Sequence, residues 1–573
     1  MSLDLVVFIL LVALIAGVGL VLRPRAQSVS ERFLASRQLS WLTLGASMAA
    51  SSLSADTAIL ITGAVYAHGL GGNWFWWVSA PGVLATLMFF APLWRRSGLV
   101  TEAEVIRLRY GDSRLAKAYR LLKAVNDGLL VNAFVVASSV LAFRLILEVL
   151  LKDTPWGVTF VSLSGVICTG FLLLTGLYTL MAGFRGLVHT NALEFGFAVI
   201  VSLILAALAV TQMPAGLDTL KTLSAQASHT PVLDSFGGQD PFSLMLLLGF
   251  GWWHTAAGQP LLVQRMVASR SETDAGLTVL SFSVFHYLLR PWGWYVIGAA
   301  ALFYFPGLPK AEQALPSMAQ ALLPSGLFGM LAASVALSFL GSVNSRFNLS
   351  ASYLVNDVGL LLKPDLGEKG RKQIETGAVL ILSGLVVVIA FSNWIPSIRG
   401  IYQFIIMMLA GTGFVAIARW YWSGTSLLSE ITSRISSLLI AGSTLVLVDI
   451  QDPKTFALMV GVNFLAGAII TLLTARLWPD RERTTAKRFF DQVRPPGPGW
   501  SENGHGSVHA LTRPFASWAL GNIALFSLIF AGINLLSGQG WGALALVALA
   551  ILSSLGLWVI RRPAALVPSS REL

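Results

Sequence analysis

The stretch from Gly45 to Leu70, GASMAASSLSADTAILITGAVYAHGL, decides the fold. Its two ends are apolar enough for the interior of a bilayer, whereas its middle packs small hydroxyl residues around the carboxylate of Asp56. A carboxylate at that depth is costly and normally faces a partner or a water-lined cavity. Small polar residues compete for backbone hydrogen bonds, so we expect the helix to break here and turn carbonyl oxygens inward. The stretch predicts an ion or solute site; the alternative is a serine-rich face that packs against a neighbouring helix.

The composition is that of a membrane protein. Of the 573 residues, 55% are hydrophobic and 12% are charged, against about 25% charged residues in ordinary globular domains. We therefore expect an all-α polytopic membrane protein that lies in the lipid bilayer. The net charge of +11 does not indicate a nucleic-acid partner, because the basic residues gather in alternate loops, as membrane topology requires. The single Cys168 excludes a disulfide framework.

Apolar runs of about 20 residues, the length that crosses a bilayer, recur along the chain, and we count about fifteen of them. They lie at roughly 3–22, 40–70, 73–94, 119–151, 155–181, 189–211, 241–263, 278–305, 318–358, 374–396, 399–422, 428–449, 455–478, 515–537 and 540–560. Basic residues are concentrated in the odd-numbered loops, which are therefore expected to be cytoplasmic. This places the N-terminus outside and the C-terminus in the cytoplasm.

Several motifs resemble one family. The segment from Tyr178 to Val188, followed by Thr190–Glu194, is similar to the "Y-T-x-x-G-G-x-x-A-V-x-x-T-D-x-x-Q" element of sodium–solute symporters. Gly258-Gln259-Pro260 with Val263-Gln264-Arg265 resembles their signature ending in Gln-Arg, and Arg419-Trp420-Tyr421-Trp422 resembles a later element. The resemblance covers roughly residues 30–500 and keeps the order of the motifs.

The resemblance implies a leucine-transporter-type fold with a 5+5 inverted-repeat core. The charge pattern agrees with it, because the second span would start inside and the seventh outside. The expected parts are an N-terminal extra helix and first cytoplasmic loop (1–39), a first repeat of five helices (40–211), an outer loop (212–240), a second repeat of five helices (241–425), peripheral helices (426–480), a cytoplasmic linker (481–514), and two C-terminal helices with a tail (515–573).

The resemblance also implies a sodium site. Backbone carbonyls of the broken helix would come from Ala50 and Leu53, and the ninth span would supply Ser334 and Ser338. One family hydroxyl position falls on Leu337, which has no side-chain oxygen and weakens the expectation of tight sodium binding. Hydroxyls at this spacing could equally join two helices.

The solute is expected at mid-membrane, where the first helix of each repeat breaks. In the second repeat the expected break is Gly249–His254. The candidate solute-binding residues are Ser52, Asp56, Thr57, Trp252, Trp253, His254 and Gln259. Asn191 and Glu194, which stand where the family usually has Asp and Gln, are candidates for a sodium exit site; an ordinary helix cap is the alternative for Asn191.

The functional prediction is a secondary active transporter that couples inward sodium movement to uptake of a small organic solute, in a bacterial plasma (inner) membrane. A carrier that uses protons through Asp56, an ion-uncoupled carrier and a transporter-like sensor are the alternatives. No phosphate loop, metal cluster or nucleophile–base motif is visible, so we expect neither an enzyme nor a cofactor other than sodium as coupling ion.

Overall fold

The computed structural model describes residues 3–23, 29–52, 55–151, 157–227, 241–392, 397–450, 452–479, 483–503 and 508–561. This part of the chain is helical and holds no named strand, so the prediction of an all-α polytopic protein is confirmed. Within these ranges nine helices are long and apolar enough to cross a membrane, and three bent pairs pass the same test as pairs. The count of about fifteen spans stays a prediction.

The first half of the chain contains the elements α1 to α12. They are α1 (Leu3–Val21), α2 (Val29–Leu34), η1 (Ala35–Arg37), α3 (Trp41–Ser51), α4 (Ala55–His68), η2 (Leu70–Asn73), α5 (Trp74–Trp77), α6 (Ala80–Ala85), η3 (Thr86–Phe90), α7 (Ala91–Ser97), η4 (Glu102–Glu104), α8 (Val105–Tyr110), α9 (Arg114–Val125), η5 (Asn126–Leu130), α10 (Val131–Leu151), α11 (Gly157–Thr211) and α12 (Leu217–Ala227).

The second half contains the elements α13 to α28. They are α13 (Pro241–Phe250), α14 (Trp253–Ala256), α15 (Pro260–Ala268), α16 (Glu272–Ser283), η6 (Val284–Leu289), α17 (Pro291–Tyr304), η7 (Ala311–Gln313), α18 (Ala314–Leu322), α19 (Leu327–Tyr353), η8 (Leu354–Gly359), α20 (Leu360–Leu362), α21 (Glu368–Phe391), α22 (Ile398–Ala410), α23 (Gly413–Tyr421), α24 (Leu427–Leu447), α25 (Pro453–Leu477), α26 (Arg483–Val493), η9 (Pro498–Asn503), α27 (His509–Leu536) and α28 (Gly540–Arg561).

The decisive stretch is a broken helix, as expected. The hydroxyl of Ser40 caps the start of α3 by accepting a hydrogen bond from the backbone N–H of Thr43. α3 ends at Ser51, and the axis of the helix that follows is turned by 65°. Residues 53–54, between the two helices, lie outside the described residues. Polar side chains at the break satisfy backbone groups that a continuous helix would have paired.

Three sequence-based boundaries need correction. The loop expected between 181 and 189 is helical except at Gly183, where α11 joins two helices through a kink; the φ of 61° at this residue favours glycine. The run expected at 318–358 is divided before α19 by residues that include Gly326, with φ of 91°. The second break extends beyond Gly249–His254, because α15 begins only at Pro260.

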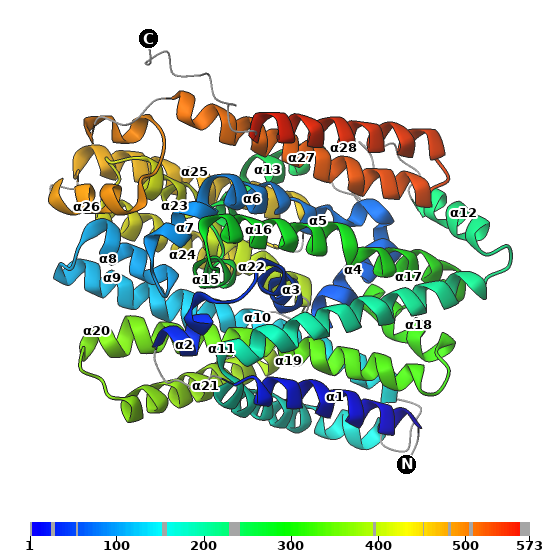
Figure 1. The fold of residues 1–573 in the computed structure, drawn as a ribbon. Helices are drawn as coiled ribbons and strands as arrows, with labels where there is room; N and C mark the ends of the chain where they lie inside the picture. Colours follow the sequence, from blue (N-terminus) through cyan, green and yellow to red (C-terminus); the bar gives the residue numbers. More distant parts are fainter. Residues whose placement is uncertain are drawn as a thin grey trace, which may run out of the picture.

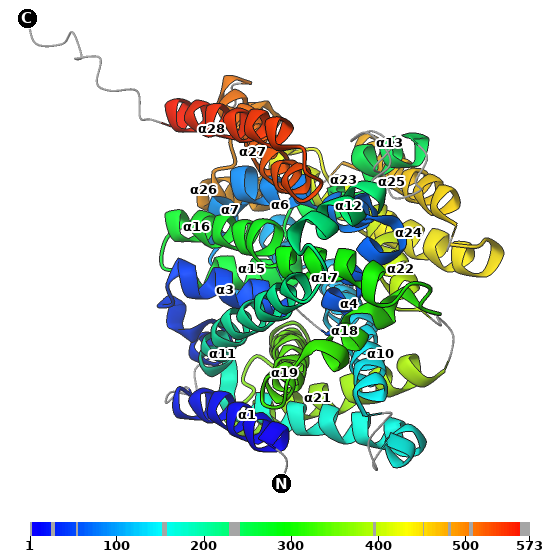
Figure 2. The same ribbon diagram turned by 90° about the vertical axis from the view of Figure 1, so that its right-hand side faces the viewer.

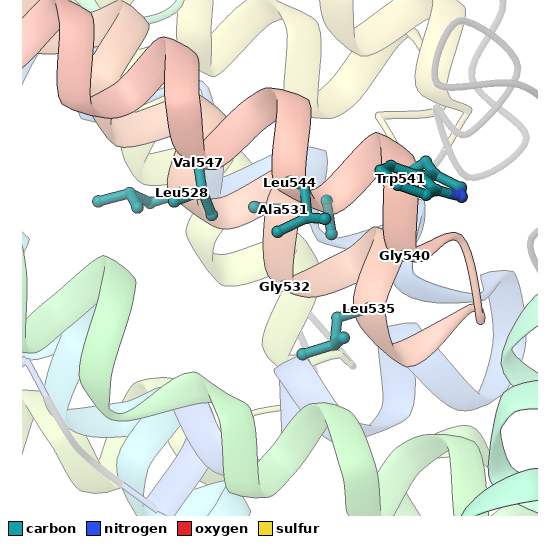
Figure 3. Close-up of a pocket in the computed structure, with 9 residues that line it drawn as sticks. Leu528, Ala531, Gly532, Leu535, Gly540, Trp541, Leu544 and Val547 are labelled. Carbon is teal, nitrogen blue, oxygen red and sulfur yellow. The ribbon is translucent and has the colours of Figure 1, made fainter.

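The first broken helix, α3 and α4, lies near the centre of the bundle (Figure 1). In both views α1 lies along one side, against α11 and α19, while α27 and α28 run along the opposite side (Figures 1 and 2). α27 and α28 pack side by side, and Figure 3 shows the apolar groove between them. The residues that line this groove are Leu528, Ala531, Gly532, Leu535, Gly540, Trp541, Ala543, Leu544 and Val547.

Four π-helical turns interrupt long helices, at η3, η5, η6 and η8. Such turns are rare and are concentrated at functional sites. They fall in the second and third helices of each expected five-helix unit, a correspondence that an internal repeat would produce. The division into 5+5 helices is otherwise untested and stays a prediction.

A buried network of charges joins the elements at one end of the bundle. Lys123 contacts the carboxylates of Glu102 and Asp127 at 2.7 Å each. Arg434 contacts Asp127 at 3.2 Å, and Arg419 contacts Glu102 at 3.3 Å. These charges are nearly inaccessible to water, so each one depends on its partners for compensation.

Arg434→Met should therefore lower the free energy of unfolding by about 3–5 kcal/mol, because it leaves Asp127 with one cation in place of two. Thermal unfolding of the detergent-purified protein measures the change. Lys372→Met is the control, since Lys372 pairs with Glu368 while the two side chains keep 62% and 53% of their surface exposed. Equal unfolding temperatures for the two variants would show that the network does not stabilise the fold.

Candidate ion and solute site

Asp56 is fully buried in the first turn of α4 and is held by hydroxyl groups from three helices. Its carboxylate accepts hydrogen bonds from Ser138 Oγ at 2.6 Å and from Tyr402 OH at 2.9 Å. Thr57 Oγ1 donates to it at 3.4 Å. Because buried carboxylates require hydrogen-bond donors, these contacts explain how α4, α10 and α22 can meet around a charge.

The side chains around the break are partly accessible although they lie inside the bundle. Ser52, Thr57, Arg346 and Tyr402 are all half-buried. Thr57 Oγ1 also lies 3.2 Å from the carbonyl oxygen of Ser52 and so connects the two sides of the break. Side chains that keep accessible surface at the centre of a helix bundle border internal space, which is the property of a ligand site.

Two arginines lie close to Asp56. Arg290 is 1% exposed, and its Nη1 donates to the carbonyl oxygen of Ala49, near the end of α3, at 3.0 Å. Arg346 Nη1 donates to Asn132 Oδ1 at 3.2 Å. Both guanidinium groups are near enough to Asp56 and Tyr402 to interact with them electrostatically.

A second polar cluster lies just before the break. Ser51 Oγ and Ser345 Oγ are 2.7 Å apart, and Asn191 Nδ2 donates to both, at 3.0 and 2.9 Å. Arg265 Nη2 lies 2.9 Å from Ser51 Oγ and 3.2 Å from Ser345 Oγ. The cluster thus joins α3, α11, α15 and α19 through hydroxyl groups that already have several donors.

Glu194 lies beside this cluster and is 2% exposed. Neither of its carboxylate oxygens has a hydrogen-bond partner among the described residues, and the same holds for Asn191 Oδ1. Both side chains face Gly341 of α19: a Cβ there would lie 2.0 Å from Glu194 Oε2 and 3.2 Å from Asn191 Oδ1. The structure thus brings Asn191 and Glu194 together, and Gly341 leaves room for them.

Ser334 and Ser338 share a small cavity. Its volume is about 40 Å³, and Ala58 and Ser202 are also among its lining residues. No hydrogen bond from either serine hydroxyl is found within the described ranges. A cavity of this size has room for a water molecule or an ion.

The other two candidate sodium ligands are placed differently. Ala50 lies in the last turn of α3, which meets α19 at Ser345, about 10 Å along that helix from Ser338 at 1.5 Å per residue. Ala50 does not line the cavity of the two serines in this conformation. Leu53 lies outside the described residues.

The candidates of the second break are not brought into contact with Asp56. The rings of Trp252 and Trp253 stack on each other, with centroids 5.0 Å apart. Trp252 also contacts Trp518 of α27, and Trp253 contacts Phe464 of α25.

The remaining two residues of the second break are placed separately. His254 follows Trp253 in α14, and its Nδ1 has no partner among the described groups. Gln259 precedes α15 and is exposed.

A model of the "Sodium:solute symporter family" matches residues 32–419. The chain belongs to the sodium:solute symporter family. The predicted family is thereby confirmed, and with it the class of function: the protein is a membrane transporter that couples sodium to the symport of a solute.

Several members of this symporter family are similar to the chain. A sodium/glucose cotransporter of Vibrio parahaemolyticus is 24% identical over 76% of this chain and 83% of its own length. A sodium/mannose cotransporter of Bos taurus is 26% identical, with 69% of each chain covered. The solved structure of a Na⁺-coupled sialic acid symporter, in a substrate-bound outward-open state, matches 84% of this chain and 98% of its own with a TM-score of 0.70 at 17% identity. This symporter therefore has the same fold.

Sequence reasoning missed several site residues. Ser138 and Tyr402 reach Asp56 from distant helices, and nothing in their sequence surroundings singles them out. Arg265, Arg290 and Arg346 did carry a signal, because an ionisable residue within an apolar run is a functional candidate by default.

Gly341→Ala should destabilise this symporter by about 1–3 kcal/mol, because the new methyl group displaces the buried carboxylate of Glu194. Thermal unfolding measures the loss, and adding Glu194→Ala in the same chain should recover much of it. The control is Gly384→Ala in α21, where a Cβ meets nothing within 4 Å. If Gly341→Ala and Gly384→Ala behave alike, Glu194 does not occupy this space.

Proposed function

We propose that sodium and the solute bind at the break between α3 and α4, and that the symporter works by alternating access. Each ligand would stabilise the same conformation, so the sodium gradient would shift the population that carries the solute. The observation that carries the proposal is the pair of hydroxyls without hydrogen bonds, Ser334 and Ser338, facing Ala58 of α4 across a cavity. Sodium needs oxygen ligands in place of its water, and free hydroxyls beside a broken helix offer them.

Ala50 and Leu53 would complete the sodium site with their carbonyl oxygens. This requires the end of α3 and the serine-bearing part of α19 to approach each other, a movement of the kind by which transporters of this fold alternate. Leu337, fully buried in the same turn, contributes no ligand. We therefore expect sodium to bind here through few side-chain oxygens.

The solute would lie beside Asp56, with Ser52 and Thr57 at the break. Trp252, Trp253, His254 and Gln259 are proposed to reach it from the second break. Asn191 and Glu194 would form a way-station for the departing sodium ion, since no donor or cation of the described residues pairs with their side-chain oxygens. The chain is proposed to lie in a bacterial inner membrane with its N-terminus outside.

Sodium should raise the unfolding temperature of the purified protein relative to choline at equal ionic strength. Binding to the folded state alone stabilises it by about 2.7 kcal/mol at a ligand concentration 100 times the dissociation constant. Ser338→Ala should remove most of this stabilisation, because it deletes a ligand without a large change in volume. A thermal-shift titration with NaCl against choline chloride measures both effects.

The matched control is Ser443→Ala, which removes a hydroxyl from an exposed position of α24. It should leave the sodium response unchanged. A wild-type protein that responds equally to sodium and choline would contradict the proposed sodium site, as would a Ser338→Ala variant with the full response.

A further inference from the structure

Arg290 keeps two buried donors that have no hydrogen-bond partner among the described residues. Its Nη1 donates a hydrogen bond to the carbonyl oxygen of Ala49. The guanidinium lies over the ring of Trp294, 5.5 Å from the ring centroid. Nε and Nη2 are buried and have no hydrogen-bond partner within the described part of the chain. Buried charged donors without acceptors are costly, so a native structure that keeps them requires an explanation.

The two free donors are adjacent on the guanidinium. Nε–H and one N–H of Nη2 point the same way along one side of the planar group, and this is an edge that binds the two oxygens of a carboxylate with parallel hydrogen bonds. A single hydroxyl or carbonyl oxygen would satisfy only one of them. The free edge of Arg290 is therefore shaped for a planar anion.

Arg346 adds a second positive charge to the same region. Its Nη1 is held by Asn132, its Nε is buried without a partner, and the side chain remains partly accessible. No ion pair of either arginine with an acidic side chain is found among the described residues. Arg290 and Arg346 both lie within electrostatic range of Asp56.

Asp56 does not supply what the arginines lack. Its carboxylate already receives three hydroxyl donors, from Ser138, Tyr402 and Thr57. The unmet requirement at the centre is thus for an acceptor with negative charge, not for another donor. An anionic ligand would balance the local charge and complete the hydrogen bonds of Arg290 at once.

We propose that the solute of this symporter is an organic acid whose carboxylate binds the Nε/Nη2 edge of Arg290, with Arg346 as the second cation. This rests on the proposed function, because it places the solute beside Asp56. A role confined to capping the carbonyl end of α3 is the competing interpretation. Capping accounts for Nη1 alone and leaves the free edge unexplained.

Matched pairs of solutes test the proposal, each consisting of a neutral compound and a relative that carries a carboxylate. The pairs are D-glucose with D-glucuronate, D-galactose with D-galacturonate, and N-acetylmannosamine with N-acetylneuraminate, titrated into the purified full-length protein in NaCl while its unfolding temperature is followed. We expect an acid to stabilise the protein where its neutral partner does not. Arg290→Gln should weaken that binding about 10- to 100-fold, the effect of losing hydrogen bonds to a charged group.

Arg290→Lys, which keeps the charge but loses the planar fork, should fall between wild type and Arg290→Gln. Arg114→Gln, at an exposed position of α9, is the control and should bind as wild type does. Arg346→Gln provides a second test should Arg290→Gln not fold. The proposal is overturned if no acid stabilises the protein, if a neutral partner binds as well as its acid, or if Arg290→Gln keeps full affinity.

The sodium response of wild type and of Arg290→Gln is read in the same experiment. A normal sodium response in Arg290→Gln shows a folded site, so a loss of acid binding then reports on Arg290 itself. A wild type that binds an acid but ignores sodium would contradict the sodium site alone. A wild type that responds to sodium but prefers neutral solutes would contradict the anionic solute alone.

Discussion

Placing the carboxylate of Asp56 at the centre of an apolar bundle is the constraint on which the surrounding structure depends. A buried carboxylate must be given donors, and here they come from α10 and α22 as well as from its own helix. They meet it in the first turn of α4, directly after the bend that separates α3 from α4. The break and the convergence of three helices therefore coincide at one polar side chain.

The need to compensate a buried charge also distinguishes the charge network around Lys123 from the surroundings of Arg290. In the network around Lys123 and Asp127 every cation meets a carboxylate, so the charges join elements that are distant in sequence. At the centre, no acidic side chain of a described residue forms an ion pair with Arg290. Charges whose partners all come from the protein hold the surrounding helices in one arrangement. A buried charge without such partners gains free energy when it binds a ligand of opposite charge. The first arrangement stabilises the fold, and the second is the one on which the proposed solute site depends.

The sequence predicted what depends on local pattern. Apolar runs located the helices, and the hydroxyl-rich stretch around Asp56 located the first break. The prediction from sequence was wrong where the course of the chain depended on the backbone conformation of one residue. At Gly183 a kink replaces the expected loop. Contacts between distant helices, such as Tyr402 with Asp56, were also out of reach, since no local spacing encodes them.

The separation of Ala50 from the cavity of Ser334 and Ser338 follows from the same geometry. α3 is held to α19 one residue after Ala50, where Ser51 meets Ser345, and Asn191 and Arg265 saturate both hydroxyls. Moving the end of α3 toward Ser338 would break several of these hydrogen bonds together. A cation bound between Ala50 and Ser338 would have to replace them, so its binding would be energetically linked to the position of α3. Linkage of that kind is what allows an ion gradient to drive a change of conformation.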